Sequence, residues 1–251
     1  CVCGICTQVC PQGVKMSEIK SRARAKLWEK KGIPLRNQLI ARPSVIGRLG
    51  APVAPLANWA LHNRSVRGLV QSTIGIHRDA PMPSFAGKTF QTRSRKHTSP
   101  SPDAPAVVYF HGCGTNWYEP RLGEMVVAVL EHNGFRVIVP KQDCCGLPLQ
   151  SNGNFPAARK YVQRLVATLA PHAHAGLPIV ANSTSCGLML KREAPEIVGV
   201  DNEDLDAVSR STSDLCEFLL RPHDRAEPRT ALASLPTPGA LHPPPPPPAA
   251  V

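Results

Sequence analysis

The sequence of 251 residues has no long uninterrupted apolar stretch, few aromatic residues and few acidic residues in its first 100 positions. A membrane-spanning helix needs about 20 predominantly apolar residues, so we do not expect one. Aromatic residues make up 5% of the chain and proline contributes 27 residues, which indicates much loop, linker or disorder. The hydrophobic content of 42% still allows a globular core, in one or two domains.

The scarcity of acidic residues makes the first 100 positions strongly basic, with 17 Lys and Arg against 3 Asp and Glu. The rest of the chain holds 12 against 15. A basic half usually has a polyanionic partner. The basic residues alternate with apolar ones and form no recognisable nucleic-acid-binding module, so we favour an anionic membrane face or a partner subunit over nucleic acid. A solvated helix face is the alternative.

The chain also lacks a recognisable signal peptide and starts with Cys1 instead of Met. We therefore expect a piece of a longer protein, and the clustered cysteines favour a reducing, cytoplasmic compartment.

Four of the nine cysteines stand at the very start: Cys1, Cys3, Cys6 and Cys10, the last followed by Pro11. The bacterial ferredoxin run C-x2-C-x2-C-x3-C-P gathers three thiolates on one cluster, and its last cysteine serves a second cluster. Cys3, Cys6 and Cys10 occupy its second, third and fourth positions, and Cys1 is one residue out of register. We favour iron–sulfur ligation over zinc, which prefers two C-x2-C pairs, and over disulfides, which suit secreted chains.

Residues 17–31 are expected to form a basic helix whose apolar face, with Ile19, Ala23 and Leu27, packs on the cysteine loop. Residues 35–77 predict short helices with the mixed basic and apolar pattern of a membrane-surface or partner contact. Residues 78–105, rich in proline, predict an extended linker.

From residue 106 the pattern alternates between strands and helices. Apolar runs at 106–110, 135–139 and 178–182 predict parallel strands, and the stretches 121–133 and 154–169 predict the helices between them. This rhythm predicts an α/β unit with right-handed crossovers.

Four further cysteines follow those strands: Cys113 after the first, Cys144 and Cys145 after the second, and Cys186 after the third. The carboxyl ends of parallel strands meet at one edge of a sheet, so we expect these thiols to converge there as a cofactor site. His111 is expected to be a capped loop residue, and Cys216 a packing residue on a helix.

These motifs resemble the family that shares a cysteine-rich CCG module: heterodisulfide reductase subunits, lactate-utilisation proteins and glycolate oxidase iron–sulfur subunits. The likeness is greatest to the branch of the C subunits of anaerobic, quinone-linked glycerol-3-phosphate dehydrogenases. It rests on Cys6 to Pro11, the basic run at 21–26, Phe110 to Cys113, Cys144 to Pro148, and Asn152-Gly153.

The resemblance implies an electron-transfer subunit with 4Fe-4S clusters that accepts electrons from a flavin-containing dehydrogenase subunit and passes them toward membrane quinone. It implies a peripheral position on the inner face of the cell membrane, beside an anchoring partner and an anionic membrane surface. Lactate or glycolate oxidation, heterodisulfide reduction, and a zinc or dithiol interaction module remain alternatives. No G-x-G-x-x-G follows a predicted strand, so the chain is not expected to oxidise the substrate itself.

The sequence also departs from this family. The first ferredoxin run is absent, Ser183 stands where the module carries a cysteine, and a polyproline tail replaces a second cysteine-rich half. The expected organisation is therefore a partial ferredoxin-type segment at 1–77, a linker at 78–105, a CCG domain at 106–226 and a disordered tail at 227–251.

Overall fold

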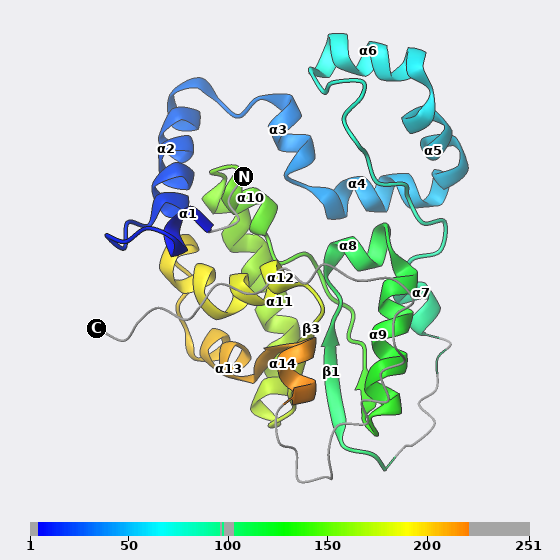
Figure 1. Cartoon of the computed structure of the whole chain (residues 1–251), viewed down its shortest axis with the longest axis vertical. Helices are drawn as coiled ribbons and strands as arrows, with labels where there is room; N and C mark the ends of the chain where they lie inside the picture. The colour runs from blue at the N-terminus through cyan, green and yellow to red at the C-terminus, as the bar shows by residue number, and fades with distance from the viewer. Residues whose placement is uncertain (1–4, 96, 98–102, 221–251) are drawn as a thin grey trace.

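The computed structural model describes residues 5–95, 97 and 103–220 (Figure 1). The predictions for Cys1, Cys3 and the tail at 227–251 lie outside these residues. The described part joins a string of helices to an α/β unit built on a parallel sheet.

The sheet contains four parallel strands in the order β2-β1-β3-β4. Their bounds are β1 Ala106–Phe110, β2 Arg136–Ile138, β3 Ile179–Ala181 and β4 Thr212–Asp214. Val108 of the central strand pairs with Ile138 on one side and with Ile179 on the other. The predicted parallel α/β architecture is confirmed, and β4 is an additional strand that the sequence did not indicate.

Both faces of the sheet are covered. Side chains alternate along β1, so neighbouring residues of this strand pack on opposite faces. Val108 and Phe110 belong to one buried cluster, which includes the helix α11 (Phe155–His174), and Val107 and Tyr109 belong to a second, which includes α9 (Pro120–His132). The unit is completed by short helices: α8 Gly112–Trp117, α10 Leu147–Ser151, α12 Thr184–Leu188, the π-helix η2 Met189–Val198, α13 Glu203–Ser211 and α14 Leu215–Leu220.

The longest helix, α11, follows from its sequence. The side chain of Asn154 accepts a hydrogen bond from the Ala157 amide and caps the first turn. Ala158, Val162, Leu165 and Leu169 recur every three or four residues and are all fully buried. Each such leucine contributes about 2 kcal/mol of burial free energy, which fixes α11 against the sheet.

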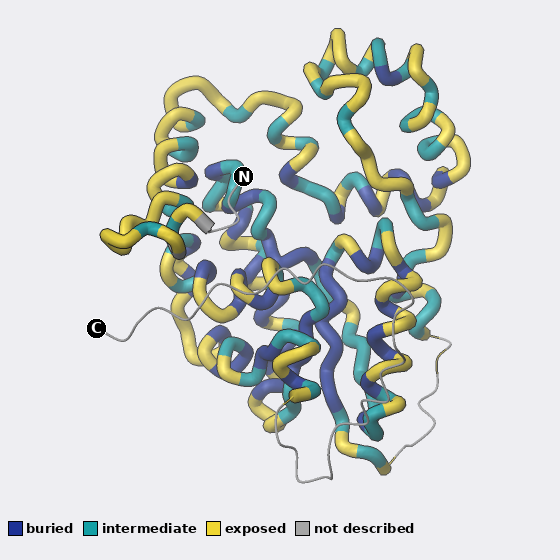
Figure 2. Tube along the Cα trace, in the orientation of Figure 1, coloured by how far each residue is buried: buried dark blue, intermediate teal, exposed yellow. Residues whose placement is uncertain are grey.

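The N-terminal half forms short helices, as predicted for residues 35–77. Their bounds are α1 Ile5–Gln8, α2 Met16–Lys31, α3 Leu35–Ile40, α4 Pro43–Gly50, the 3₁₀ turn η1 Ala51–Val53, α5 Ala54–His62 and α6 Arg64–Ile74. Figure 2 shows that these helices are largely exposed, and in Figure 1 α5 and α6 lie away from the sheet.

The prediction that Ile19 and Leu27 of α2 pack on the cysteine loop is wrong, because these side chains are 53% and 42% exposed. Instead Ser21 is the buried residue of α2. The face of α2 opposite Ile19 and Leu27 docks on the end of α10. There Arg24 and Trp28 donate hydrogen bonds to the carbonyl groups of residues 151 and 152, at 2.7 and 2.8 Å.

The prediction of an extended linker at 78–105 also needs correction. A short helix, α7 Phe90–Ser94, begins with the Thr89 side chain as its cap. Phe90 is 1% exposed and packs edge-on against Tyr109 at 5.6 Å between ring centroids. Because the Phe90 ring is buried against a strand of the sheet, α7 belongs to the α/β unit and is not part of a linker.

Candidate functional site

Three loops at the carboxyl edge of the sheet carry the candidate site. Each leaves a strand and enters a short helix: α8 after β1, α10 after β2 and α12 after β3. Gly146, with φ +83°, starts α10, and a β-carbon there would lie 3.0 Å from the carbonyl oxygen of Ala158. Only glycine permits both this backbone angle and this approach, which holds the loop with Cys144 and Cys145 close to α11.

The loops bring the four strand-end thiols together in two pairs. The sulfur of Cys144 lies 3.5 Å from that of Cys113, and the sulfur of Cys145 lies 3.4 Å from that of Cys186. Cys144 and Cys145 are buried, and all four thiols are free of disulfides. The convergence predicted from strand order is therefore confirmed.

Hydrogen bonds among the thiols divide them into two types. Bonds from Cys113 and Cys145 lower the pKa of Cys144 well below its ordinary value, against the effect of burial. A bond from Cys145, with a further one from Ser183, lowers the pKa of Cys186. The pKa values of Cys113 and Cys145 are raised, because each shares its proton with a neighbouring sulfur and is buried. Within each pair the pKa values of the two thiols are thus shifted in opposite directions.

Ser183 occupies a position where the resemblance led us to expect cysteine. Its side chain hydrogen-bonds Cys186 and so stabilises the negative charge on that sulfur. The serine hydroxyl keeps polar contact with the site, but it is a harder ligand than a thiolate.

Polar residues that the sequence did not single out hold the second loop. Asp143 accepts a hydrogen bond from the Cys144 amide at 2.9 Å and forms an ion pair with Arg164 at 3.0 Å. Arg164 stacks on the ring of Tyr161, 4.5 Å from its centroid. The side chain of Gln142 accepts from the backbone amide of residue 111 and donates to the carbonyl of residue 109, joining the loops that follow β1 and β2.

His111 precedes α8 at its N-cap, a loop position as expected, but its side chain is buried, with 2% of the residue exposed. Its Nδ1 lies 2.7 Å from the carbonyl oxygen of Gly112, so Nδ1 carries the proton. Burial lowers the pKa of the imidazole to about 4. Within the described residues Nε2 has no hydrogen-bond partner, which leaves a buried acceptor close in the chain to Cys113.

The four thiols fit a soft metal or an iron–sulfur cluster by chemistry, since sulfur donors with thiolate character are the ligands that both use. The carboxylate of Asp143 is engaged by backbone and Arg164, so it does not compete with the sulfurs. Across residues 5–95, 97 and 103–220, no group of three or more His, Cys, Asp or Glu is arranged to hold a metal ion. The sulfurs stand as two close pairs instead.

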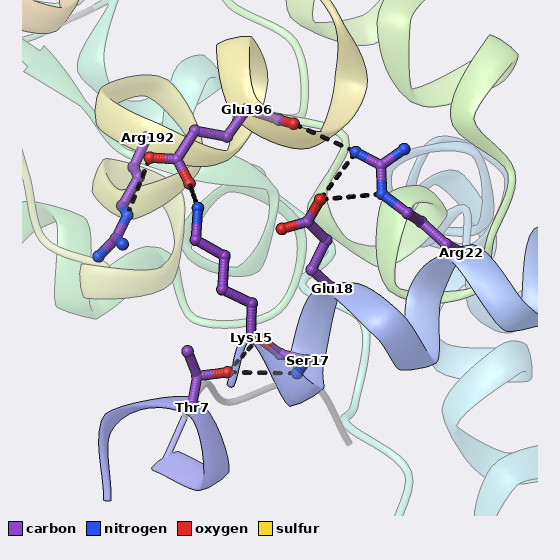
Figure 3. A network of polar contacts seen from close by, with 7 residues as sticks. All are labelled: Thr7, Lys15, Ser17, Glu18, Arg22, Arg192 and Glu196. Carbon is purple, nitrogen blue, oxygen red and sulfur yellow. Dashed lines mark hydrogen bonds and ion pairs between the residues drawn. The ribbon is translucent and has the colours of Figure 1, made fainter. Parts of the chain in front are cut away.

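The N-terminal cysteines lie elsewhere. Cys6, on α1, is exposed and Cys10 is half-buried, while Cys1 and Cys3 lie outside the described residues. Figure 3 shows how α1 and α2 join the α/β unit: Thr7 bonds Ser17 at 2.9 Å, and Lys15 forms an ion pair with Glu196 of η2 at 3.2 Å. Because η2 follows α12, Lys15 contacts the helix that comes directly after the one that carries Cys186.

Cys216 lies on α14, as predicted, but its side chain is exposed, so it is not a packing residue. It belongs neither to the four-thiol group nor to the N-terminal run.

The fold and the four thiols define a cysteine-rich domain. Residues 107–191 match the family model described as "Cysteine-rich domain" and named CCG, so the chain carries a CCG domain. It is also 32% identical over 198 residues to the C subunit of anaerobic glycerol-3-phosphate dehydrogenase from Escherichia coli (strain K12). That match covers 78% of this chain and 50% of the relative.

Two proteins named lactate utilization protein A are more distant relatives. The protein of an Exiguobacterium species is 30% identical over 120 residues, covering 46% of this chain and 48% of that protein. The protein of Bacillus thuringiensis is 27% identical over 137 residues, covering 54% and 55%. The chain thus spans about half the length of the curated relatives it matches. No solved structure matches the chain.

Proposed function

We propose that this chain is part of an iron–sulfur electron-transfer subunit, which receives electrons from a flavin-containing dehydrogenase subunit and passes them toward membrane quinone. Glycerol-3-phosphate is the proposed substrate of the partner, because the relative with 32% identity over 198 residues belongs to a glycerol-3-phosphate dehydrogenase. The observation that carries the proposal is the convergence of four thiols at the carboxyl edge of a CCG domain.

The residues divide into two groups of proposed ligands. Cys113, Cys144, Cys145 and Cys186 would hold a cluster at the sheet edge. Cys3 and Cys6 would serve one 4Fe-4S cluster and Cys10 another, with Cys1 as a further candidate. A bound cluster supplies one-electron transfer. The chain supplies sulfur ligands, and Asp143 and Gln142 hold the loop that carries two of them.

Anaerobic reconstitution with iron and sulfide tests this proposal. We expect bound iron, bound sulfide and charge-transfer absorption at about 400 nm, which are general properties of thiolate-ligated clusters. Cys144→Ser should lower the iron content, whereas Cys216→Ser, on the exposed α14, should leave it unchanged. A colourless, iron-free wild-type protein would contradict the proposal.

We propose that α4 to α6 contact an anionic membrane surface. From residue 30 to residue 78 the chain contains no Asp or Glu. Leu56, Trp59 and Leu69 are 66%, 58% and 64% exposed on these helices, with Arg48 and Arg64 exposed among them. Exposed apolar side chains with basic neighbours suit the interface of an anionic bilayer. No helix in the described residues is long and apolar enough to cross a membrane.

Vesicle flotation tests the membrane proposal. We expect binding to phosphatidylglycerol vesicles that weakens with salt, and little binding to phosphatidylcholine. The double variant Leu56→Ser, Trp59→Ser should release the protein from the phosphatidylglycerol vesicles. The matched variant Leu122→Ser, Met125→Ser removes two exposed apolar side chains from α9 and should not. Equal release by both variants would refute a specific contact at α5.

A zinc or dithiol interaction module is the second candidate, because of the sulfur spacing. Two thiolates on one zinc ion at about 2.3 Å lie about 3.8 Å apart, close to the 3.4 and 3.5 Å contacts within the two sulfur pairs. Elemental analysis of protein purified without oxygen decides between the two. One zinc per chain with no iron selects the module, and iron with sulfide selects the cluster.

A further inference from the structure

A cleft of about 570 Å³ opens beside one of the two sulfur pairs. Cys113 and Cys144 line it from the sheet edge, and residues of α4 and α7 line it as well. The walls are fixed by contacts from three parts of the chain. Tyr118 donates to the Pro43 carbonyl at 2.9 Å, and the Gln91 amide donates to the side chain of Asn116 at 3.0 Å. The volume is in the range of small-molecule sites, about 300 to 1,000 Å³.

The charged side chains that line this cleft are mostly cationic. Arg48, Lys88, Arg95 and Lys141 come from four separate places in the chain, and all are exposed. Within the described residues none of the four has a carboxylate partner. Among the described residues of the lining Asp143 is the one acidic residue, and its ion pair with Arg164 neutralises it. Four unpaired cations around one cavity attract an anion.

A buried polar atom gives a second, independent indication. His111 lines the same cleft, and its Nε2 is an acceptor that has no partner in the described part of the chain. The Nδ1 contact with the Gly112 carbonyl makes Nδ1 the donor of the ring, so Nε2 is its acceptor. A buried acceptor without a donor is costly, so a ligand hydroxyl at this place would remove that cost.

We propose that the cleft beside Cys113 binds a small hydroxylated anion, whose carboxylate or phosphate group contacts Arg48 and Lys141 and whose hydroxyl donates a hydrogen bond to His111. A bound anion goes beyond the electron-transfer role, because it would place a small molecule beside the sulfur atoms of Cys113 and Cys144. It depends on the cleft and not on which metal the thiols hold.

Titration calorimetry on the full chain at fixed ionic strength tests the proposal, with malate, succinate and inorganic phosphate as probes. Malate differs from succinate by one hydroxyl, and one hydrogen bond corresponds to a roughly two- to tenfold difference in affinity. We expect malate to bind more tightly than succinate by that factor. Comparing the affinity for phosphate with the affinities for malate and succinate shows whether the cleft prefers a phosphate or a carboxylate group. Equal binding of malate and succinate would remove His111 from the proposal.

Matched variants locate the site. The double variant Arg48→Ala, Lys141→Ala should weaken malate binding by at least about tenfold, because charge-assisted hydrogen bonds are lost. Arg210→Ala removes an exposed arginine of α13 outside the cleft and should leave malate binding unchanged. Circular dichroism checks that each variant is folded. The proposal is overturned by the absence of saturable binding of any probe, or by equal losses in the two variants.

Discussion

At the scale of single residues, the vicinal cysteines 144 and 145 have different partners. Cys144 faces Cys113, and Cys145 faces Cys186. Strand order in the sequence sufficed to predict that the four thiols meet, because parallel strands end at one edge. The pairing could not be predicted, since it depends on how Gly146 turns the loop and on how Asp143 and Gln142 fix it.

The pairing predicts the products of mild oxidation. In metal-free protein, diamide should take two electrons from each pair and form the disulfides Cys113–Cys144 and Cys145–Cys186. Sulfur atoms 3.4 to 3.5 Å apart need only a small movement to reach bonding distance, about 2.05 Å. Peptide mapping by mass spectrometry identifies the bonds. A dominant Cys144–Cys145 bond, or one that includes the exposed Cys216, would contradict the observed pairing.

Glu193 of η2 predicts a pH-dependent stability. It is 8% exposed, and its Oε2 has no partner within the described residues. Burial raises the pKa of this carboxyl from 4.5 to about 6. The stability that the protonated form contributes is fully present below pH 4.5 and is lost as the pH rises through 6.

The variant Glu193→Gln should therefore be more stable than the wild type at pH 7.5, by about 1 to 2 kcal/mol, with the difference shrinking toward pH 4.5. Urea unfolding at the two pH values measures this. Glu29→Gln, at an exposed position of α2, serves as the control and should show no such trend. A constant difference at both pH values would show that ionisation of Glu193 is not the cause.

At the scale of elements, prediction succeeded where apolar residues recur with a clear period. β1 occupies the predicted residues 106–110, and the helix predicted at 154–169 is observed as α11, Phe155–His174. β4 was missed because Thr212, Ser213 and Asp214 form no apolar run, and only pairing with β3 makes them a strand. α7 was missed because prolines surround it, while its stability comes from burial of Phe90.

The packing of α7 on α9 depends on a glycine. A β-carbon at Gly123 of α9 would overlap the ring of Phe90. Gly123→Ala should therefore destabilise the protein by about 1 to 3 kcal/mol, the usual cost of overpacking. Urea unfolding measures the change.

Gly68→Ala on α6 is the matched control. No atom lies within 4 Å of a β-carbon there, so alanine should be neutral or stabilise by up to about 1 kcal/mol through its helix propensity. If the two variants were equally stable, the close contact between α9 and Phe90 would carry no energetic weight.

At the scale of the whole molecule, the basic N-terminal helices are fixed to the α/β unit. The carbonyl groups of Ser151 and Asn152 accept hydrogen bonds from α2, and Asn37 of α3 donates to the Asn152 side chain at 3.0 Å. The turn that receives them ends α10, which follows directly on Cys145 and Gly146. Asn152-Gly153 was noticeable in the sequence only as part of a resemblance, because a docking contact between distant segments leaves no periodic pattern.

Gly153 makes this docking testable. Its φ is +77°, and a β-carbon there would lie 2.7 Å from the backbone nitrogen of Ala25 in α2. Gly153→Ala should push α2 off the turn, so that limited trypsin digestion cuts after Lys26, Lys30 and Lys31 several-fold faster. The α/β unit should stay folded, because its two buried clusters do not include this turn.

The control for this digestion is Gly176→Ala, since the φ of Gly176 is +75° but nothing lies within 4 Å of a β-carbon there. Both variants carry the cost of a left-handed alanine, about 1 to 2 kcal/mol. Only the first removes the contact with α2, so faster cleavage in Gly153→Ala alone assigns the effect to docking. Equal cleavage in both would assign it to backbone strain and refute a fixed arrangement of the two halves.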